Sequence, residues 1–189
     1  PGSHRLGALL GADAVKVAAA LLFVTPAIPL LFMGEEYGEV APFPFFMSFL
    51  EPGLNEAVRR GRQREVERFG WRTLIDDPGD PTTFSRARLE HVLADASGHR
   101  DLRAYYRAWL ALRRSHPALG ARGKRSTRVE TTLDVLTLAR EAATGERVVL
   151  VANLGATAQP LPPLAPGARV LLDSADSRFG GAGGAPLRP

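Results

Sequence analysis

A short apolar run, punctuated by prolines and followed at once by carboxylates, constrains this chain more than any other stretch. Residues 28–33 read I-P-L-L-F-M, and residues 34–39 read G-E-E-Y-G-E. An apolar run of this length between turn residues is typical of a strand that is buried on both faces. Carboxylates just past the carboxyl end of a buried parallel strand lie where barrel enzymes build their sites. The pattern predicts a buried strand with a functional loop behind it, although a core strand with a purely structural loop explains the same residues.

The stretch behind these carboxylates is rich in aromatic rings. Residues 40–46 read V-A-P-F-P-F-F, so that prolines separate Phe43 from the pair Phe45 and Phe46. Proline restricts the backbone and stiffens such a loop. A stiff aromatic loop beside a polar strand end suits a sugar-binding site, because small-molecule sites combine apolar walls with a few placed polar groups.

Helical periodicity lies on both sides of this stretch. Residues 14–24 predict a helix that is apolar almost all round and therefore buried, with Asp13 as its N-cap. A helix is also predicted over 54–69, where Gly61 indicates a break or a close packing contact. The clearest helical pattern covers 100–115, with apolar and aromatic side chains at i, i+3, i+4 and i+7.

Residues 71–83 form a turn-rich stretch with several aspartates. Loop carboxylates could bind calcium, which takes several oxygen ligands, but the spacing lacks the full calcium-loop pattern. Turns and caps explain these residues more simply. We therefore assign no metal site and expect an N-cap at Thr82 or Thr83 that starts a helix over 84–93.

The pattern changes from helical to strand-like near Gly120. Strands are predicted over 126–132, 135–140, 147–153 and 168–173. Thr144 and Gly145 favour a hairpin between the second and third of these strands. We therefore divide the chain into residues 1–120 and a small antiparallel, sandwich-like β domain over 121–189, whose Gly- and Ala-rich end (174–189) is expected to be loose.

Four segments, in this order, resemble the α-amylase-type glycoside hydrolases, and among them the malto-oligosyltrehalose trehalohydrolases most closely. P-L-L-F-M-G-E-E-Y-G-E with P-F-P-F-F resembles the family's eighth barrel strand and its loop, and L-N-E-A-V-R-R-G-R-Q-R-E resembles a helix with a Gly-Arg pair. D-P-G-D-P-T-T-F-S-R-A-R-L resembles an Asp-Pro-rich segment, and Y-Y-R-A-W-L-A-L-R-R-S-H-P-A-L resembles the last barrel helix. The strand motif alone indicates the wider superfamily, and the combination points to the trehalohydrolases.

The resemblance implies an α/β part followed by a β part. Residues 1–120 would be the C-terminal part of a (β/α)8 barrel, comprising the last strand and its flanking helices, and 121–189 the small antiparallel β domain. Glycosidic hydrolysis needs two carboxyl groups on opposite sides of the bond. The family carries them on barrel strands four and five, with a supporting Asp on strand seven. The catalytic carboxylates are therefore expected upstream of Pro1, both ends look cut, and the remainder of the barrel is expected in the same parent chain.

The resemblance implies contacts with substrate rather than catalysis for the residues present, and this chain alone is expected to be inactive. Glu35 and Glu36 cannot both flank one bond, because neighbouring side chains on an extended segment point to opposite sides. Glu36 is expected to hydrogen-bond barrel or loop groups. The aromatic residues expected to border the sugar cleft are Tyr37, Phe43, Phe45 and Phe46.

Arg62 follows the mid-helix glycine and has two possible roles. It could pair with a loop carboxylate such as Glu36 or Glu39 and so belong to the substrate site. It could equally be a surface arginine beside Glu65 or Glu67.

The reaction that the resemblance implies is hydrolysis of the α-1,4 bond next to the trehalose end of maltooligosyl trehalose, which releases trehalose without a cofactor.

Composition argues against several other classes of protein. The chain has no cysteine, which excludes a disulfide framework, a thiolate nucleophile and a Cys-based zinc site, and fits a reducing cytoplasm. The net charge of +4 and the pI of about 10.1 can mark nucleic-acid binding, but the arginines have acidic neighbours, so no nucleic-acid partner is expected. Prolines break the apolar run 15–32, which also contains Lys16, so an interior helix and strand are favoured over a membrane span or a leader.

Two alternatives remain open. The shared strand motif also fits a glucan branching or debranching enzyme of the α-amylase family. A non-catalytic carbohydrate-binding or interaction module would need exposed rings, and Phe179 is the only aromatic residue in 121–189.

Overall fold

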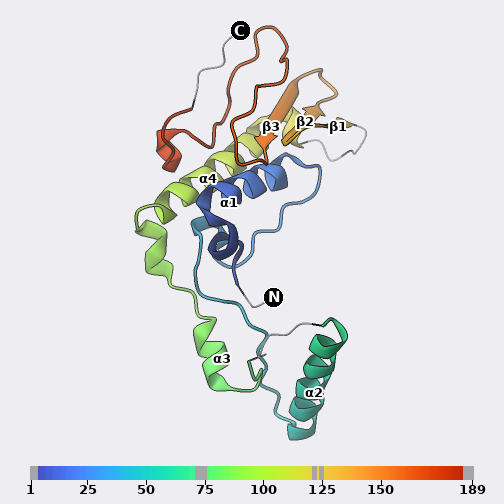
Figure 1. Ribbon diagram of the computed structural model, residues 1–189, viewed down its shortest axis with the longest axis vertical. Coiled ribbons are helices and arrows are strands. Elements are labelled where there is room, and N and C mark those ends of the chain that lie inside the picture. The colour runs from blue at the N-terminus through green and yellow to red at the C-terminus, as the bar shows by residue number, and fades with distance from the viewer. Residues whose placement is uncertain (1–3, 71–75, 121–122, 124–125, 185–189) are drawn as a thin grey trace.

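The computed structural model describes residues 4–70, 76–120, 123 and 126–184. Helices α1 and α4 pack together beside a small sheet, while α2 and α3 lie at the end of the molecule away from the sheet (Figure 1). The elements in chain order are α1 (Leu6–Val24), η1 (Glu35–Tyr37), α2 (Pro52–Arg68), α3 (Pro81–Arg86), η2 (His91–Asp95), α4 (His99–Ser115), α5 (Pro117–Gly120), β1 (Thr127–Thr132), β2 (Val135–Glu141), β3 (Arg147–Asn153) and η4 (Ser177–Phe179).

Helix α1 is longer than the predicted helix and is bent. Gly11 has φ 79° and ψ 171°, a non-helical conformation that glycine adopts readily. Asp13 does not cap the helix, whose N-cap is Arg5; its carboxylate instead lies 3.4 Å from the Lys16 ammonium. Over the predicted range 14–24 no residue is exposed, and the fully buried positions form one face: Val15, Lys16, Ala19, Ala20, Phe23 and Val24.

Within the described ranges, α1 is the one helix long and apolar enough to span a membrane by length and composition alone. A core helix of a soluble protein meets the same criteria. The buried face of α1 belongs to the main hydrophobic core, which fits the predicted interior helix.

Residues 28–33 do not form the predicted strand. The strands in the described part of the chain are the three of one sheet, in the order β1-β2-β3, and none includes this segment. Ile28 and Leu30 are each 77% exposed, so the expected burial on both faces is also absent. A strand needs a neighbour for its amides and carbonyls, and these three strands pair with one another.

Helix α4 forms within one residue of its prediction and lies at the centre of the core. Its buried side chains are Leu102, Tyr105, Tyr106 and Trp109. Phe23 of α1 meets Tyr106 edge-on, with ring centroids 5.7 Å apart, and stacks on Trp109 at 6.3 Å. The aromatic stripe read from the sequence is therefore core rather than a ligand platform.

The sheet confirms the three predicted strands and the hairpin. All pairs are antiparallel, and the turn between β2 and β3 contains Gly145 at φ 89° and a bond from the Ala142 amide to the Glu146 carbonyl. No strand forms over 168–173. Residues 174–184 are not wholly loose, because η4 buries Phe179 against Tyr105 with centroids 5.2 Å apart; residues 185–189 lie outside the described ranges.

One hydrophobic core draws on both sides of position 120. Phe23 and Trp109 come from the first part, and Leu138 and Val148 come from the sheet. The division of the chain into 1–120 and 121–189 stays a prediction.

Two arginines hold the carboxyl end of α1. Arg113 of α4 donates to the carbonyls of Phe23, Thr25 and Ala27, and Arg140 of β2 donates to the Val24 carbonyl at 2.7 Å. The last carbonyls of a helix lack intrahelical partners, and cations suit this end of the helix dipole. Burial, followed by the charge of Arg113, lowers the pKa of Arg140. The helix bundle and the sheet thus jointly set the direction in which the chain leaves α1.

Candidate functional site

The carboxylate loop, residues 34–39, is shaped by two glycines in left-handed conformations. Gly34 has φ 84° and Gly38 has φ 72°, and the short helix η1 lies between them. A Cβ atom on Gly34 would lie 2.7 Å from the Tyr37 hydroxyl and 2.8 Å from the Glu39 Cβ, which no side chain can tolerate. Glycine is therefore required at position 34, both by φ and by space.

Glu39 is the most enclosed carboxylate of the loop, at 2% exposure. Its Oε1 accepts from the amides of Val40 and Ala41, each at 2.8 Å. Its Oε2 accepts from the Tyr37 hydroxyl at 3.0 Å and from the Glu90 amide at 2.8 Å. Burial alone would raise the pKa of Glu39, but these donors outweigh it and hold the pKa below the ordinary value.

Tyr37 is 4% exposed and acts as a strut within the loop. Burial, with the neighbouring Glu39, raises the pKa of Tyr37 to about 12, so its hydroxyl stays protonated and donates. Its carbonyl lies 2.8 Å from Nδ1 of His99, at the start of α4. Contact between Tyr37 and a sugar stays a prediction; in this chain the ring supports the loop.

The hydrogen bonds expected of Glu36 are made by its neighbours. Glu35 accepts from the Phe32 amide at 3.0 Å and from the Tyr106 hydroxyl at 3.4 Å, and Glu39 has the four donors described above. Burial, followed by the charge of Glu35, raises the pKa of Tyr106. Glu36 is half-buried and has no hydrogen-bond partner within the described ranges, so its expected bond to barrel groups stays a prediction.

The aromatic loop, residues 40–46, takes part in a series of edge-to-face ring contacts that also includes Phe32 and Phe84. Phe32 meets Phe43 at 4.9 Å, Phe43 meets Phe46 at 5.8 Å, and Phe46 meets Phe84 of α3 at 5.2 Å. Phe45 is 46% exposed and stands outside this chain of rings. The structure thus brings together two of the three predicted loop phenylalanines, Phe43 and Phe46, and adds Phe84, which the sequence did not single out.

Arg62 lies with Glu65, and not with Glu36 or Glu39. Its guanidinium donates to the Glu65 carboxylate and lies 4.9 Å from the centre of the Phe45 ring. The surface pairing is therefore confirmed, while the cation–π contact still attaches Arg62 to the aromatic loop. The predicted break or close contact at Gly61 is wrong, because α2 continues through it and a Cβ there would meet nothing within 4 Å.

Arg5 was missed by the sequence analysis, yet it binds both ends of the carboxylate loop. It donates to the carbonyls of Ala41 and Met33, each at 2.9 Å. Its guanidinium also lies 5.7 Å from the ring of Phe32 and 5.8 Å from that of Phe43. No local pattern marks this role, since the partners are 28 and 36 residues away.

Asp77 and Asp80, beyond α2, serve a turn and a helix cap, and Asp76 pairs with Arg86. Asp77 accepts from Arg59 and the Gly79 amide, at 3.0 Å and 2.9 Å. Asp80, rather than Thr82 or Thr83, is the N-cap of α3, which ends at Arg86 instead of continuing over 84–93. Among the described residues no group of three or more His, Asp or Glu side chains could hold a metal ion.

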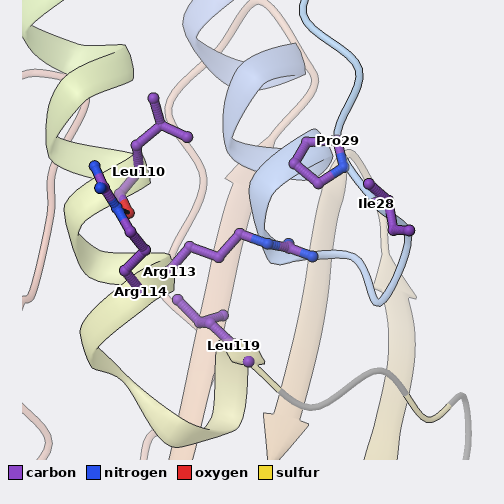
Figure 2. A pocket seen from close by; sticks show the side chains of 7 residues that line it. Ile28, Pro29, Leu110, Arg113, Arg114 and Leu119 are labelled. Atoms are coloured by element: carbon purple, nitrogen blue, oxygen red, sulfur yellow. Dashed lines mark hydrogen bonds between the residues drawn. The ribbon is translucent and has the colours of Figure 1, made fainter.

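A cavity of about 260 Å³ lies between α4 and the segment that follows α1. Figure 2 shows Arg113 extending across it toward that segment. The six predicted site residues do not line it. The candidate site is therefore the surface of the aromatic loop, which presents an exposed Phe45 and half-buried Phe43 and Phe46 but no pair of open carboxylates for acid–base chemistry.

Comparisons with known proteins match separate parts of the chain. Residues 124–189 match a family model described as a domain of unknown function, DUF3459. The chain is 44% identical to a malto-oligosyltrehalose trehalohydrolase of Rhizobium sp. (strain M-11) over 127 residues. This match covers 67% of this chain and 21% of the relative. The chain is also 37% identical over 115 residues to the enzyme of the same name from Saccharolobus solfataricus, covering 61% of this chain and 18% of the relative.

A solved structure also resembles this one. It is the crystal structure of a putative α-amylase from Salmonella typhimurium, with a TM-score of 0.76 and 36% identity over 89% of this chain and 29% of that chain. This likeness confirms the predicted fold class at the level of an α-amylase-type enzyme with a small antiparallel β part. The chain spans about a fifth of the length of the curated relatives it matches.

Proposed function

We propose that this chain, which is related to the malto-oligosyltrehalose trehalohydrolases, is the C-terminal part of a glycoside hydrolase of the α-amylase family. The observation that carries the proposal is the 44% identity to a trehalohydrolase over 127 residues. The matched solved structure, a putative α-amylase, supports the same family.

The proposed reaction of the parent enzyme is hydrolysis of the α-1,4 bond next to the trehalose end of maltooligosyl trehalose. Such a reaction needs a carboxylic acid and a carboxylate on opposite sides of the bond. Glu39 is enclosed by donors, and Glu35 is engaged by Phe32 and Tyr106. These contacts favour a supporting role for this chain, with the catalytic carboxylates in a part of the parent that this chain does not contain.

The proposed contribution of this chain to substrate binding is the aromatic loop. Phe45 is exposed and its ring lies against the Arg62 guanidinium, while Phe43 and Phe46 of the same loop contact each other. Aromatic rings pack on the apolar faces of sugar rings while hydroxyl groups remain hydrogen-bonded at the edges. We propose an α-glucan bearing a trehalose end as the substrate that this surface contacts.

An α-amylase-family enzyme acting on ordinary α-glucans is the second candidate, favoured by the name of the matched solved structure. A separate carbohydrate-binding module receives no such support. The one aromatic residue of 121–189, Phe179, is 4% exposed and therefore unavailable to a sugar.

The size of the native protein is the first test. An antibody against residues 100–119 would detect it in extracts of source cells. Because 127 residues make up 21% of the first relative, we expect a species about three times heavier than this 20.3 kDa chain. A native species of 20.3 kDa would overturn the proposal for this polypeptide.

The reaction is tested on the purified parent. Release of trehalose from maltooligosyl trehalose is compared with cleavage of a maltooligosaccharide of equal length and of a branched glucan. Faster release of trehalose is the expected result. Preference for the plain or the branched glucan would contradict the trehalohydrolase assignment and favour the second candidate.

A further inference from the structure

The carboxylate of Glu39 joins segments that are far apart in the chain. Two of its donors, the amides of Val40 and Ala41, are local. A third, the amide of Glu90, lies 51 residues further along, just before η2. The charge of Glu39 therefore ties the start of the aromatic loop to the segment that follows α3.

A second pair of contacts ties the other end of the same loop to the same segment. The Met47 amide donates to the Pro78 carbonyl at 2.8 Å. The Phe46 ring meets Phe84 of α3 at 5.2 Å. The loop between these two attachments carries the exposed aromatic surface, and both attachments lead to residues 78–90.

We propose that Glu39 is a positioning residue for substrate binding, which clamps residues 40–46 to the segment 78–90 so that the loop rings keep one arrangement toward the sugar. This inference rests on the proposed function. Ordering a loop costs conformational entropy, and a loop that is already ordered avoids that cost when ligand binds. Because the clamp acts on binding and not on the reacting atoms, its loss is expected to change KM more than kcat.

The change Glu39→Gln tests the long-range bond selectively. An amide has one acceptor oxygen, so it can satisfy the two local amides or the Glu90 amide, but not both sets. Keeping the two local bonds turns the NH2 group toward the N–H of Glu90, where two donors face each other. The Tyr37 hydroxyl can rotate and accept instead, so the bond to Glu90 is the one that is lost.

The experiment compares the full-length parent enzyme with its E39Q and E90Q variants. We expect E39Q to raise KM for maltooligosyl trehalose about fivefold or more, with kcat within about twofold of the parent. E90Q is the matched control, because it makes the same charge change at the exposed side chain whose backbone amide donates to Glu39. E90Q keeps that backbone bond and is expected to leave KM unchanged.

Amide hydrogen exchange supplies a readout that does not depend on activity. In E39Q the peptides covering 40–47 and 84–91 are both expected to exchange faster, while E90Q exchanges like the parent. Faster exchange confined to residues 40–41, or an unchanged KM in folded E39Q, would overturn the clamp. If the parent does not cleave maltooligosyl trehalose, the proposed function fails, and the exchange comparison still decides the clamp.

A second variant covers the case in which E39Q does not fold. Tyr37→Phe removes one donor to Glu39 and leaves a ring of nearly the same size in the same buried position. We expect a smaller increase in KM, of about twofold, with kcat retained. An unchanged KM in Y37F, together with parent-like exchange over 84–91, would then overturn the proposal.

Discussion

Single buried charges are stabilised here by hydrogen bonds to backbone groups. Glu39 receives three amides and a hydroxyl, and Arg140, at 0% exposure, donates to the Val24 carbonyl. A buried charge without such partners would be costly. Each of these residues therefore connects segments that are distant in the sequence.

Acid is expected to weaken the loop through Glu39. Its pKa in the folded protein lies below the ordinary 4.5, so its contribution to stability is complete above about pH 4.5 and is lost as the pH falls through the folded value. Urea unfolding of the parent and of E39Q, measured from neutral pH into this acidic range, should show their difference in stability shrinking. Other carboxylates titrate in both proteins, so only this difference reports on Glu39. Parallel pH profiles would refute the assignment.

Phe45 is expected to contact sugar. Phe45→Ala in the parent should raise KM for maltooligosyl trehalose about fivefold, which corresponds to about 1 kcal/mol of lost binding. Phe49→Ala is the matched control, because Phe49 is 43% exposed against 46% for Phe45 and lies four positions away. It should leave KM unchanged. Equal effects of the two variants, or none for F45A, would count against the aromatic surface.

Pairs of elements carry the stability of the core, and α1 with α4 is the central pair. Phe23, at 0% exposure, fills the space between Tyr106 and Trp109. Phe23→Ala should lower the free energy of unfolding by about 3 to 5 kcal/mol, through lost burial and the cavity left behind. Leu9→Ala, on the same helix but 64% exposed, should cost less than about 0.5 kcal/mol. Chemical unfolding measures both, and similar losses would disprove the packing argument.

Elements with a local signal were predictable from the sequence. The periodicities of 54–69 and 100–115 became α2 and α4, and the hairpin residues placed β2 and β3 correctly. The segment 28–33 has the composition of a buried strand, but its strand state depends on neighbours that none of the described residues supply. The segment 168–173 likewise stays outside the sheet.

At the scale of the whole molecule, several large apolar side chains remain exposed. The most exposed large apolar side chains include Leu9, Leu10, Ile28, Leu30, Leu50, Val92 and Leu133. Exposed apolar side chains that share one segment, as Ile28 and Leu30 do, promote association more than isolated ones. The 189-residue chain by itself is therefore expected to form oligomers or aggregates.

Sedimentation velocity at several concentrations measures this association. The double change Ile28→Ser and Leu30→Ser should reduce it, because these two side chains are each 77% exposed and lie in the segment predicted to pair with further strands. Val92→Ser, at 74% exposure in η2, is the control and should have little effect. A monomeric wild-type chain that melts sharply would contradict the prediction.

The candidate site was only partly predictable. The aromatic loop follows from the sequence, but only Phe43 and Phe46 of its three phenylalanines are in ring contact. The alternative partners of Arg62 included the one observed. The roles of Arg5 and Glu39 could not be read locally, because each depends on groups that are brought close by folding.

The sequence by itself determined helices α2 and α4, the antiparallel hairpin and the family resemblance, because these depend on periodicity, turn residues and short motifs. Tertiary structure alone decided which carboxylate organises the loop: Glu39 rather than Glu36. It also decided that Arg113 and Arg140 would hold the end of α1, and that residues 28–33 would remain unpaired. The physical reason is common to all three. A buried charge is stable only with partners, and a strand forms only beside another strand; in both cases the partners are distant in sequence.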